Sequence, residues 1–339
     1  MGRGPCRAAG GGAIACAPVL AAYVTRTNAD DPLSALELGE RPEPEAPDGW
    51  TTVTVRAASL NHHDLWSLRG VGLPDDRLPM ILGCDAAGVD EEGAEVIVHS
   101  VIATPDWRGD ETLDPKRTLL SELHQGALAE RVAVPRANLV PKPESLSFEE
   151  AACLPTAWLT AYRMLFVKAA AQPGQTVLVQ GAGGGVATAA IALGHQAGLR
   201  VFATSRDEAK LAAAEELGAD AVFESGARLP ERVDIVLETV GEATWKHSLR
   251  ALKPGGALVV SGATSGQAPS AELQRMFFLQ LRVLGSTMGT REELRQLVRL
   301  LDVSGLRPRV DRVLPLADAR EGFAAMAEGS LVGKAVFRP

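Results

Sequence analysis

The 339-residue chain is predicted to have an α/β fold, in which a β-rich N-terminal region precedes a doubly wound parallel sheet. Two observations predict this fold. An apolar run at 176–180 is followed by clustered glycines, a helix-forming stretch and a second apolar run at 200–204, which is the order of a strand, helix, strand unit. Residues 22–58 instead contain short alternating runs, which are typical of half-exposed strands. The length allows two domains, each with its own core.

The glycine cluster within residues 176–210 gives the clearest indication of a ligand. Its members, at positions 181, 183, 184 and 185, lie between the first strand and a helix predicted at 187–196. Glycines at such a junction bring backbone amides close to a phosphate, and the helix N-terminus adds partial positive charge. We therefore predict a bound dinucleotide; the alternative is a glycine-rich loop in an ordinary α/β domain.

The end of the second strand indicates which dinucleotide is bound. An NAD site usually places an acidic residue there, but Ser205 and Arg206 occupy this position. Together with Lys210, they can bind a ribose phosphate through charge-assisted hydrogen bonds. The sequence therefore predicts NADPH. The alternative is that Arg206 and Lys210 are solvated charges that balance Asp207 and Glu208.

Composition narrows the class of partner. The 34 basic and 42 acidic side chains give a net charge of -8, and no basic run is long enough to indicate nucleic acid or an anionic membrane. We expect a small-molecule partner. Four cysteines, at positions 6, 16, 84 and 153, show neither CxxC spacing nor the density of a disulfide scaffold, which favours a cytoplasmic location. No run approaches the length of a membrane-spanning helix.

The first 20 residues combine Arg3 and Arg7 with a stretch rich in glycine and alanine. Three consecutive glycines and Pro18 weaken the apolar core that a secretory signal needs. We therefore expect residues 1–20 to be a disordered extension.

The remaining elements follow the same two patterns. Half-exposed strands are predicted at 22–25, 35–39 and 50–58, where apolar residues alternate with polar ones. After the glycine cluster, we predict a helix at 207–217, strands at 221–223 and 233–237, a helix ending near 252 and a strand at 257–261.

The chain resembles the medium-chain dehydrogenase/reductase superfamily in eight stretches, which recur in the order and spacing of that family. They are SLNHHDLW at 59–66, PMILGCDAAGV at 79–89, GALAERVAVP at 126–135, LPTAWLTAY at 154–162, the glycine cluster, VLETVG at 236–241, LKPGGALVVSGATSG at 252–266 and VGKAVF at 332–337.

The resemblance implies a particular division of the chain. A GroES-like β-barrel catalytic domain would occupy 21–154, a Rossmann NADP-binding domain 155–288, and the catalytic domain would resume at 289–339. The apolar run at 276–284 resembles the edge strand through which relatives dimerise, which predicts a homodimer. By its residues alone, this run is equally a buried internal strand.

The resemblance also implies roles for individual residues around the cofactor. Gly184, Gly185 and Val186 would hold the pyrophosphate, Thr160 would lie beside the nicotinamide, Lys334 would lie near the cofactor, and Val240, Gly262 and Ala263 would line its cleft.

Many members of the superfamily hold a catalytic zinc ion, and this chain departs from their ligand pattern. Asn61 stands where they carry the first cysteine, Gly83-Cys84-Asp85 replaces their GHE motif, and Thr156 lies near their third ligand. Residues 98–122 lack the four cysteines of a structural zinc lobe. We therefore predict no metal site, and we expect Cys84 to be a small buried hydrophobe.

Without a zinc site, the chain resembles the quinone oxidoreductase and enoyl reductase branch of the superfamily. Enzymes of this branch pass hydride from NADPH to a quinone or to an activated C=C bond. Hydride addition to an α,β-unsaturated carbonyl compound puts negative charge on oxygen, which hydrogen-bond donors stabilise without a Lewis acid. The catalytic candidates are Asn61, as that donor, and His62 or His63, as a proton source.

Other interpretations stay open. Asn61 is equally a turn-forming residue, and a histidine in such a turn is commonly a packing residue. At the level of the whole protein, the alternatives are a zinc-dependent alcohol dehydrogenase with atypical ligands and a non-catalytic NADPH-binding protein.

Overall fold

The computed structural model describes residues 18–339, in two compact units. Unit 1 contains the described residues from position 18 up to Pro155, with Arg312–Ser330 and Ala335–Pro339, and unit 2 contains Thr156–Asp311 and Leu331–Lys334. Positions 1–17 of the predicted extension, which include Cys6 and Cys16, lie outside the described residues. The last two residues of the predicted extension, 19 and 20, belong to the first strand, which begins at Val19. None of the helices in 18–339 is long and apolar enough to cross a membrane.

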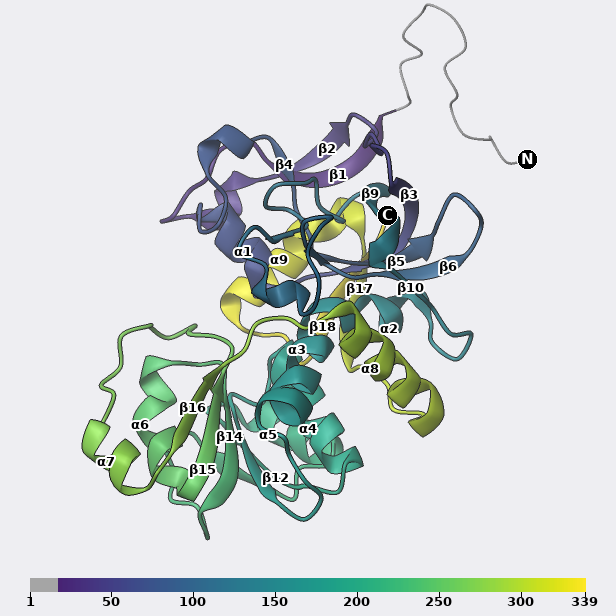
Figure 1. The fold of residues 1–339 in the computed structure, drawn as a ribbon. Helices are drawn as coiled ribbons and strands as arrows, with labels where there is room; N and C mark the ends of the chain where they lie inside the picture. Colours follow the sequence, from purple (N-terminus) through teal and green to yellow (C-terminus); the bar gives the residue numbers. More distant parts are fainter. Residues whose placement is uncertain (1–17) are drawn as a thin grey trace, which may run out of the picture. The chain divides into compact units, whose positions relative to one another are not determined.

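Unit 1 is mostly antiparallel sheet, which confirms the predicted β-rich beginning (Figure 1). Its elements are β1 (Val19–Val24), β2 (Leu36–Arg41), β3 (Trp50–Ser59), α1 (His62–Leu68), β4 (Met80–Ile81), β5 (Asp85–Val89), β6 (Glu95–Val98), β7 (Val101–Ile102), β8 (Thr118–Leu119), β9 (Arg131–Pro135), β10 (Leu139–Pro141), α2 (Phe148–Ala152), β17 (Val310–Pro315), α9 (Ala319–Glu328) and β18 (Lys334–Arg338). The main sheet has the order β10-β6-β5-β3-β18-β17, with β9 paired to β3, and a smaller sheet has the order β2-β1-β4.

Strand β3 determines where the candidate catalytic residues lie. Alternate residues along its first part are buried, as the sequence pattern predicts for a half-exposed strand. β3 pairs with β5 in antiparallel register, and Ser59 lies opposite Asp85. The last residue of β3 thus lies beside the first residue of β5. Positions 61–63, which follow β3, therefore come close to position 84, which precedes β5.

Unit 2 contains a six-stranded parallel sheet with helices packed on it, which confirms the predicted doubly wound sheet. Its elements are α3 (Leu159–Tyr162), β11 (Thr176–Gln180), α4 (Gly185–Gln196), β12 (Arg200–Ser205), α5 (Glu208–Glu216), β13 (Ala221–Glu224), β14 (Val233–Glu238), α6 (Glu242–Ala251), β15 (Leu252–Val260), α7 (Leu273–Phe278), β16 (Arg282–Gly285) and α8 (Arg291–Ser304). Figure 1 shows α4 and α5 on one side of this sheet and α6 on the other. The strand order is β13-β12-β11-β14-β15-β16, so the direction of winding reverses between β11 and β14, where such folds bind their ligands.

The apolar run at 276–284 is not one strand, which corrects the sequence-based expectation. Its first residues belong to α7 and its last ones to β16. The backbone of Gln280 has φ 52°, in the left-handed region, and this turn separates the two elements. β16 is the last strand of the sheet, next to β15. The homodimer expected through this edge stays a prediction.

The predicted return to the first domain at residue 289 differs from the division in the structure. Helix α8 belongs to unit 2, and its apolar face, with Leu294, Leu297 and Leu301, is buried there. The spacing of three and four residues puts these side chains on one face of the helix. The chain re-enters unit 1 only at Arg312.

The helical segment that carries Thr160 is fixed within unit 2 by a buried ion pair. Helix α3 is flanked by π-helical turns at Leu154–Trp158 and Arg163–Lys168, and such turns are frequent at functional sites. Arg163 is 2% exposed, and its Nη1 donates to both carboxylate oxygens of Glu293, at 3.0 and 2.8 Å. The pair therefore ties this segment to α8.

Replacing Glu293 by glutamine keeps the size of the side chain but removes the charge that compensates the buried guanidinium. We expect Glu293→Gln to lower the free energy of unfolding by about 3 kcal/mol in urea titrations followed by tryptophan fluorescence. Glu292→Gln is the matched control, because Glu292 lies on the same helix but is 56% exposed in its pair with Arg295. The control should cost less than about 0.5 kcal/mol, and equal losses in the two variants would contradict the argument.

Candidate active site

The predicted phosphate-binding loop of unit 2 lies where β11 ends and α4 begins. Gly184 is the N-cap residue of α4 and Gly185 is its first residue, so the first N–H groups of the helix have no partner within the helix. A Cβ atom at Gly185 would lie 2.8 Å from Cδ of Lys334, and one at Gly183 would collide with the side chain of Lys210. Glycine at these two positions therefore lets two lysine side chains cross the loop.

Lys334 reaches this loop because the chain returns to unit 2 for residues 331–334. The N–H of Gly333 donates to the carbonyl of Gly183 at 3.0 Å, and the N–H of Lys334 donates to the carbonyl of Arg309 at 3.0 Å. Lys334 is only 2% exposed. A buried ammonium group beside a helix N-terminus suits an anionic ligand such as a diphosphate.

The turn after β14 forms the neighbouring wall. A Cβ atom at Gly181 would lie 2.9 Å from Cγ2 of Val240, so this turn touches the glycine loop. The fully buried carboxylate of Glu238 fixes the turn, because it accepts from the N–H groups of Val240 at 2.8 Å and Gly241 at 3.0 Å. The structure therefore places Val240 beside the glycine loop.

The residues after β15 complete this wall. A Cβ atom at Gly262 would lie 2.8 Å from the carbonyl oxygen of Thr239, and one at Gly241 would lie 2.9 Å from Cα of Ala263. The carboxyl ends of β11, β14 and β15 thus gather most of the predicted cofactor residues within unit 2. Thr160 is buried in α3, and Val186 lies in the first turn of α4.

Hydroxyl and cationic side chains stand at the end of β12. Ser205 is 6% exposed and its Oγ accepts from the N–H of Asp207 at 3.1 Å, while Arg206 is exposed. The carboxylate of Asp207 caps α5, where it accepts from the N–H groups of Ala209 at 2.9 Å and Lys210 at 3.3 Å. Because the nearby carboxylate is used for capping, this edge favours a ribose phosphate over unmodified ribose hydroxyls.

Asn61 is the N-cap residue of α1 in unit 1. Its Nδ2 donates to Oδ2 of Asp85 at 2.8 Å and to the carbonyl of Ser59 at 3.3 Å, and the side chain of Asp64 accepts from the Asn61 N–H at 2.8 Å. Asn61 is 6% exposed. Because its amide group already donates twice within unit 1, the geometry favours the turn-forming role of Asn61 over that of a donor to substrate.

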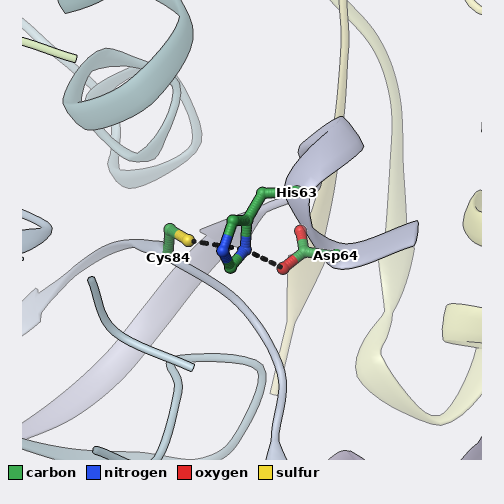
Figure 2. A group of neighbouring side chains, drawn as sticks. All are labelled: His63, Asp64 and Cys84. Carbon is green, nitrogen blue, oxygen red and sulfur yellow. Dashed lines mark hydrogen bonds and ion pairs between the residues drawn. The ribbon is translucent and has the colours of Figure 1, made fainter. Parts of the chain in front are cut away.

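The two adjacent histidines point to different surroundings. His62 is exposed, whereas His63 lies between Cys84 and Asp64 (Figure 2). Nδ1 of His63 is 3.3 Å from Sγ of Cys84 and 4.0 Å from Oδ1 of Asp64. Cys84 is fully buried, as expected for a small buried side chain, and its thiol also donates a weak hydrogen bond to the carbonyl of Leu120 at 3.4 Å.

Glu122 is a member of this cluster that sequence reasoning missed. Its Oε1 lies 3.2 Å from Nε2 of His63, and its Oε2 accepts from the N–H of Leu119 at 3.0 Å. No local pattern marks Glu122, because its partner is 59 positions away in the sequence. Only the folded loop after β8 brings the two together.

The surroundings shift the pKa values of all three groups. Burial lowers the pKa of His63, but the Cys84 sulfur and hydrogen bonds with Asp64, Cys84 and Glu122 outweigh burial and raise it well above its ordinary value. Burial raises the pKa of the Cys84 thiol by more than His63 lowers it. Burial also raises the pKa of Glu122, but hydrogen bonds from His63 and Leu119 bring it below its ordinary value. The direction for Glu122 favours a carboxylate beside His63.

A catalytic zinc ion needs three protein ligands and one open position. Within residues 18–339, His63, Asp64 and Cys84 could supply donors, and their atoms lie within 4.8 Å of one another. Both oxygens of Asp64 already accept backbone N–H groups, from Asn61 at 2.8 Å and Gly83 at 3.0 Å, and His63 contacts Cys84 directly. Each Asp64 oxygen keeps a further lone pair beside its backbone hydrogen bond, so the absence of a metal site stays a prediction.

Comparison with known proteins gives consistent matches over both units. The family model of the alcohol dehydrogenase GroES-like domain matches residues 47–144, and that of the zinc-binding dehydrogenase matches residues 185–302. Acryloyl-coenzyme A reductase of Sulfurisphaera tokodaii is 27% identical over 327 residues, which cover 91% of this chain and 98% of that protein.

Two solved structures share the fold. An NAD-dependent alcohol dehydrogenase is 34% identical, with a TM-score of 0.87 over 94% of this chain and 99% of its own. The 2-octenoyl-CoA carboxylase reductase CinF, solved with NADP and 2-octenoyl-CoA, is 27% identical, with a TM-score of 0.87 over 95% of this chain and 87% of its own. With its parallel-sheet unit, its glycine loop and these matches, the chain belongs to the medium-chain dehydrogenase/reductase superfamily.

Proposed function

We propose that this chain is an NADPH-dependent reductase that transfers hydride, without zinc, to the C=C bond of an α,β-unsaturated carbonyl compound or to a quinone. NADPH supplies the hydride when it is bound. The chain holds the diphosphate and the ribose phosphate, orients the nicotinamide and stabilises the negative charge that develops on the substrate oxygen.

The cationic edge of unit 2 is the observation that carries this proposal. Lys210 and Lys334 cross the glycine loop, and Arg206 follows the end of β12, where the carboxylate of Asp207 is used for capping. Charge-assisted hydrogen bonds from such groups favour a nucleotide with an additional phosphate. The NADP bound to CinF supports the same cofactor for this chain.

Relatives support the acceptor class. The reductase of S. tokodaii is named for acryloyl-coenzyme A, and CinF was solved with 2-octenoyl-CoA. Both compounds carry a C=C bond conjugated to a thioester carbonyl, so an enoyl thioester is the first substrate that we propose. A quinone offers a similar acceptor, because hydride addition also leaves the charge on oxygen.

Turnover and metal content together test this function on the purified chain. We expect oxidation of NADPH with crotonyl-CoA or a simple enone, faster than oxidation of NADH and unchanged by a chelator; a simple quinone tests the other acceptor. A bound metal ion with alcohol oxidation that a chelator abolishes would support a zinc-dependent alcohol dehydrogenase instead. The zinc-dependent alcohol dehydrogenase is the second candidate function, because the chain is 34% identical to an NAD-dependent alcohol dehydrogenase.

A third outcome has a separate meaning. Tight NADPH binding without turnover of any of these substrates would indicate a non-catalytic NADPH-binding protein.

Arg206 should discriminate between the two nicotinamide cofactors. In fluorescence titrations, we expect Arg206→Ala to raise the Kd of NADPH by about tenfold, through loss of one charge-assisted hydrogen bond, and to change the Kd of NADH by less than about twofold. Arg250→Ala is the control, because this exposed arginine lies in the last turn of α6, just before β15 starts, at the amino ends of the strands and away from the end of β12. Equal weakening of both cofactors by Arg206→Ala would contradict a role in phosphate recognition.

A further inference from the structure

Glu238 is a fully buried carboxylate at the carboxyl end of β14, in unit 2. Its Oε1 accepts from the backbone N–H groups of Val240 at 2.8 Å and Gly241 at 3.0 Å. Both of its oxygens accept from Oγ1 of Thr244 at 2.9 Å, and Oε2 also accepts from Oγ of Ser248 at 2.6 Å. These four groups are neutral donors, which suits an ionised carboxylate, because it can only accept.

The two oxygens of Glu238 face different groups. Oε1 faces the backbone of the turn at 239–241, whereas Oε2 faces hydroxyl groups of α6. A hydroxyl group can rotate its proton toward another acceptor, but the direction of a backbone N–H group is fixed by the chain. The geometry of the turn therefore depends on an acceptor at the position of Oε1.

The turn at 239–241 is the shared wall between two loops of the predicted nucleotide site. On one side, a Cβ atom at Gly181 would lie 2.9 Å from Cγ2 of Val240. On the other side, the carbonyl oxygen of Val240 accepts from the N–H and from Oγ of Ser265, both at 2.7 Å. A shift of this turn would therefore disturb the glycine loop and the loop after β15 together.

Buried side chains also connect Glu238 to the strand that leads into the glycine loop. Oγ of Ser248, which donates to Glu238, accepts from Nε2 of Gln180 at 2.9 Å. Gln180 is the last residue of β11 and is 1% exposed, and its Oε1 accepts from Oγ1 of Thr204 in β12. The carboxylate is therefore anchored to the strand from which the glycine loop starts.

We propose that Glu238 is a positioning residue of the NADPH site, which holds the turn at 239–241 in place against the glycine loop before the cofactor binds. The role rests on the nucleotide site of the function proposed above. Because Glu238 is fully buried, it acts through Val240, whose side chain lies beside the glycine loop. A preformed wall favours binding, because less of the binding free energy is then lost in ordering the protein.

Removal of the acceptor tests this role. In fluorescence titrations without substrate, we expect Glu238→Ala to raise the Kd of NADPH by about tenfold, because the N–H groups of Val240 and Gly241 lose this acceptor. Glu238→Gln should restore the Kd to within about threefold of that of the unmodified protein, since an amide oxygen can take the place of Oε1. Equal losses of affinity in the two variants would overturn the proposal.

Asp234→Ala is the matched control on the same strand. Asp234 lies near the start of β14, and its Oδ2 accepts from the backbone N–H of Thr176 at 2.8 Å and from Nζ of Lys253 at 2.8 Å. It also connects β14 to β11, but at the amino ends of the strands. Asp234→Ala should lower the melting temperature, as Glu238→Ala should, and change the Kd of NADPH by less than about twofold. Equal rises of Kd in both variants would indicate a general loss of structure and overturn the proposal.

Hydrogen exchange tests the role without any variant, and so decides it even if Glu238→Ala does not fold. In the cofactor-free protein, the amide groups of Val240 and Gly241 should exchange slowly, because Glu238 already accepts from them. Rapid exchange that becomes slow only when NADPH is added would show that the cofactor orders the turn, and would overturn the proposal.

Binding and turnover separate this role from the proposed function. An unchanged Kd of NADPH in Glu238→Ala would overturn the positioning role even in a protein that reduces enoyl substrates. A raised Kd that Glu238→Gln restores, in a protein that reduces none of the substrates, would support the positioning role and refute the proposed function.

Discussion

The buried carboxylate of Asp64 is the interaction on which the candidate active site depends. Its two oxygens accept from the N–H of Asn61, at the start of α1, and from the N–H of Gly83, before β5. β3 and β5 pair with Ser59 opposite Asp85, so the segment after β3 and the segment before β5 are neighbours. Asp64 joins these two segments by its hydrogen bonds. Loss of the carboxylate would leave two buried N–H groups without this acceptor, which is costly.

The same carboxylate belongs to the cluster around His63, because its Oδ1 lies 4.0 Å from Nδ1 of that ring. Each of its oxygens accepts one backbone N–H group and keeps a further lone pair. His63 also lies between a thiol and a second carboxylate, those of Cys84 and Glu122. These contacts come from three separate segments of unit 1 and hold the ring in one orientation.

A second buried network gives rigidity to the carboxyl edge of the parallel sheet. Thr204 donates to Gln180, Gln180 donates to Ser248 at 2.9 Å, and Ser248 donates to Glu238 at 2.6 Å. The chain of bonds crosses from β12 through β11 to β14, and Glu238 then holds the turn of Val240. Polar groups that are fully satisfied in a low-dielectric interior fix one geometry, which is what a preformed nucleotide site requires.

The sequence by itself determined the parallel-sheet unit, because unbroken apolar strands, a glycine cluster and a helix in fixed order have one common arrangement. It also identified His63 and the cationic side chains Arg206 and Lys210 as residues of interest, since charge and residue type are local properties. It misjudged the run at 276–284, where the left-handed backbone of Gln280 separates helix from strand. Hydrophobicity alone carries no information on such a turn.

Only the tertiary structure decided what surrounds those residues. The contact of His63 with Glu122 spans 59 positions and depends on the conformation of Ser121, and the position of Lys334 at the glycine loop depends on a return of the chain to unit 2. Both are long-range contacts, whose geometry is set by how whole segments pack. Residue identities therefore determined which chemical groups were available. Packing decided which of these groups form hydrogen bonds with one another, because a hydrogen bond requires a distance of about 3 Å between segments that are remote in sequence.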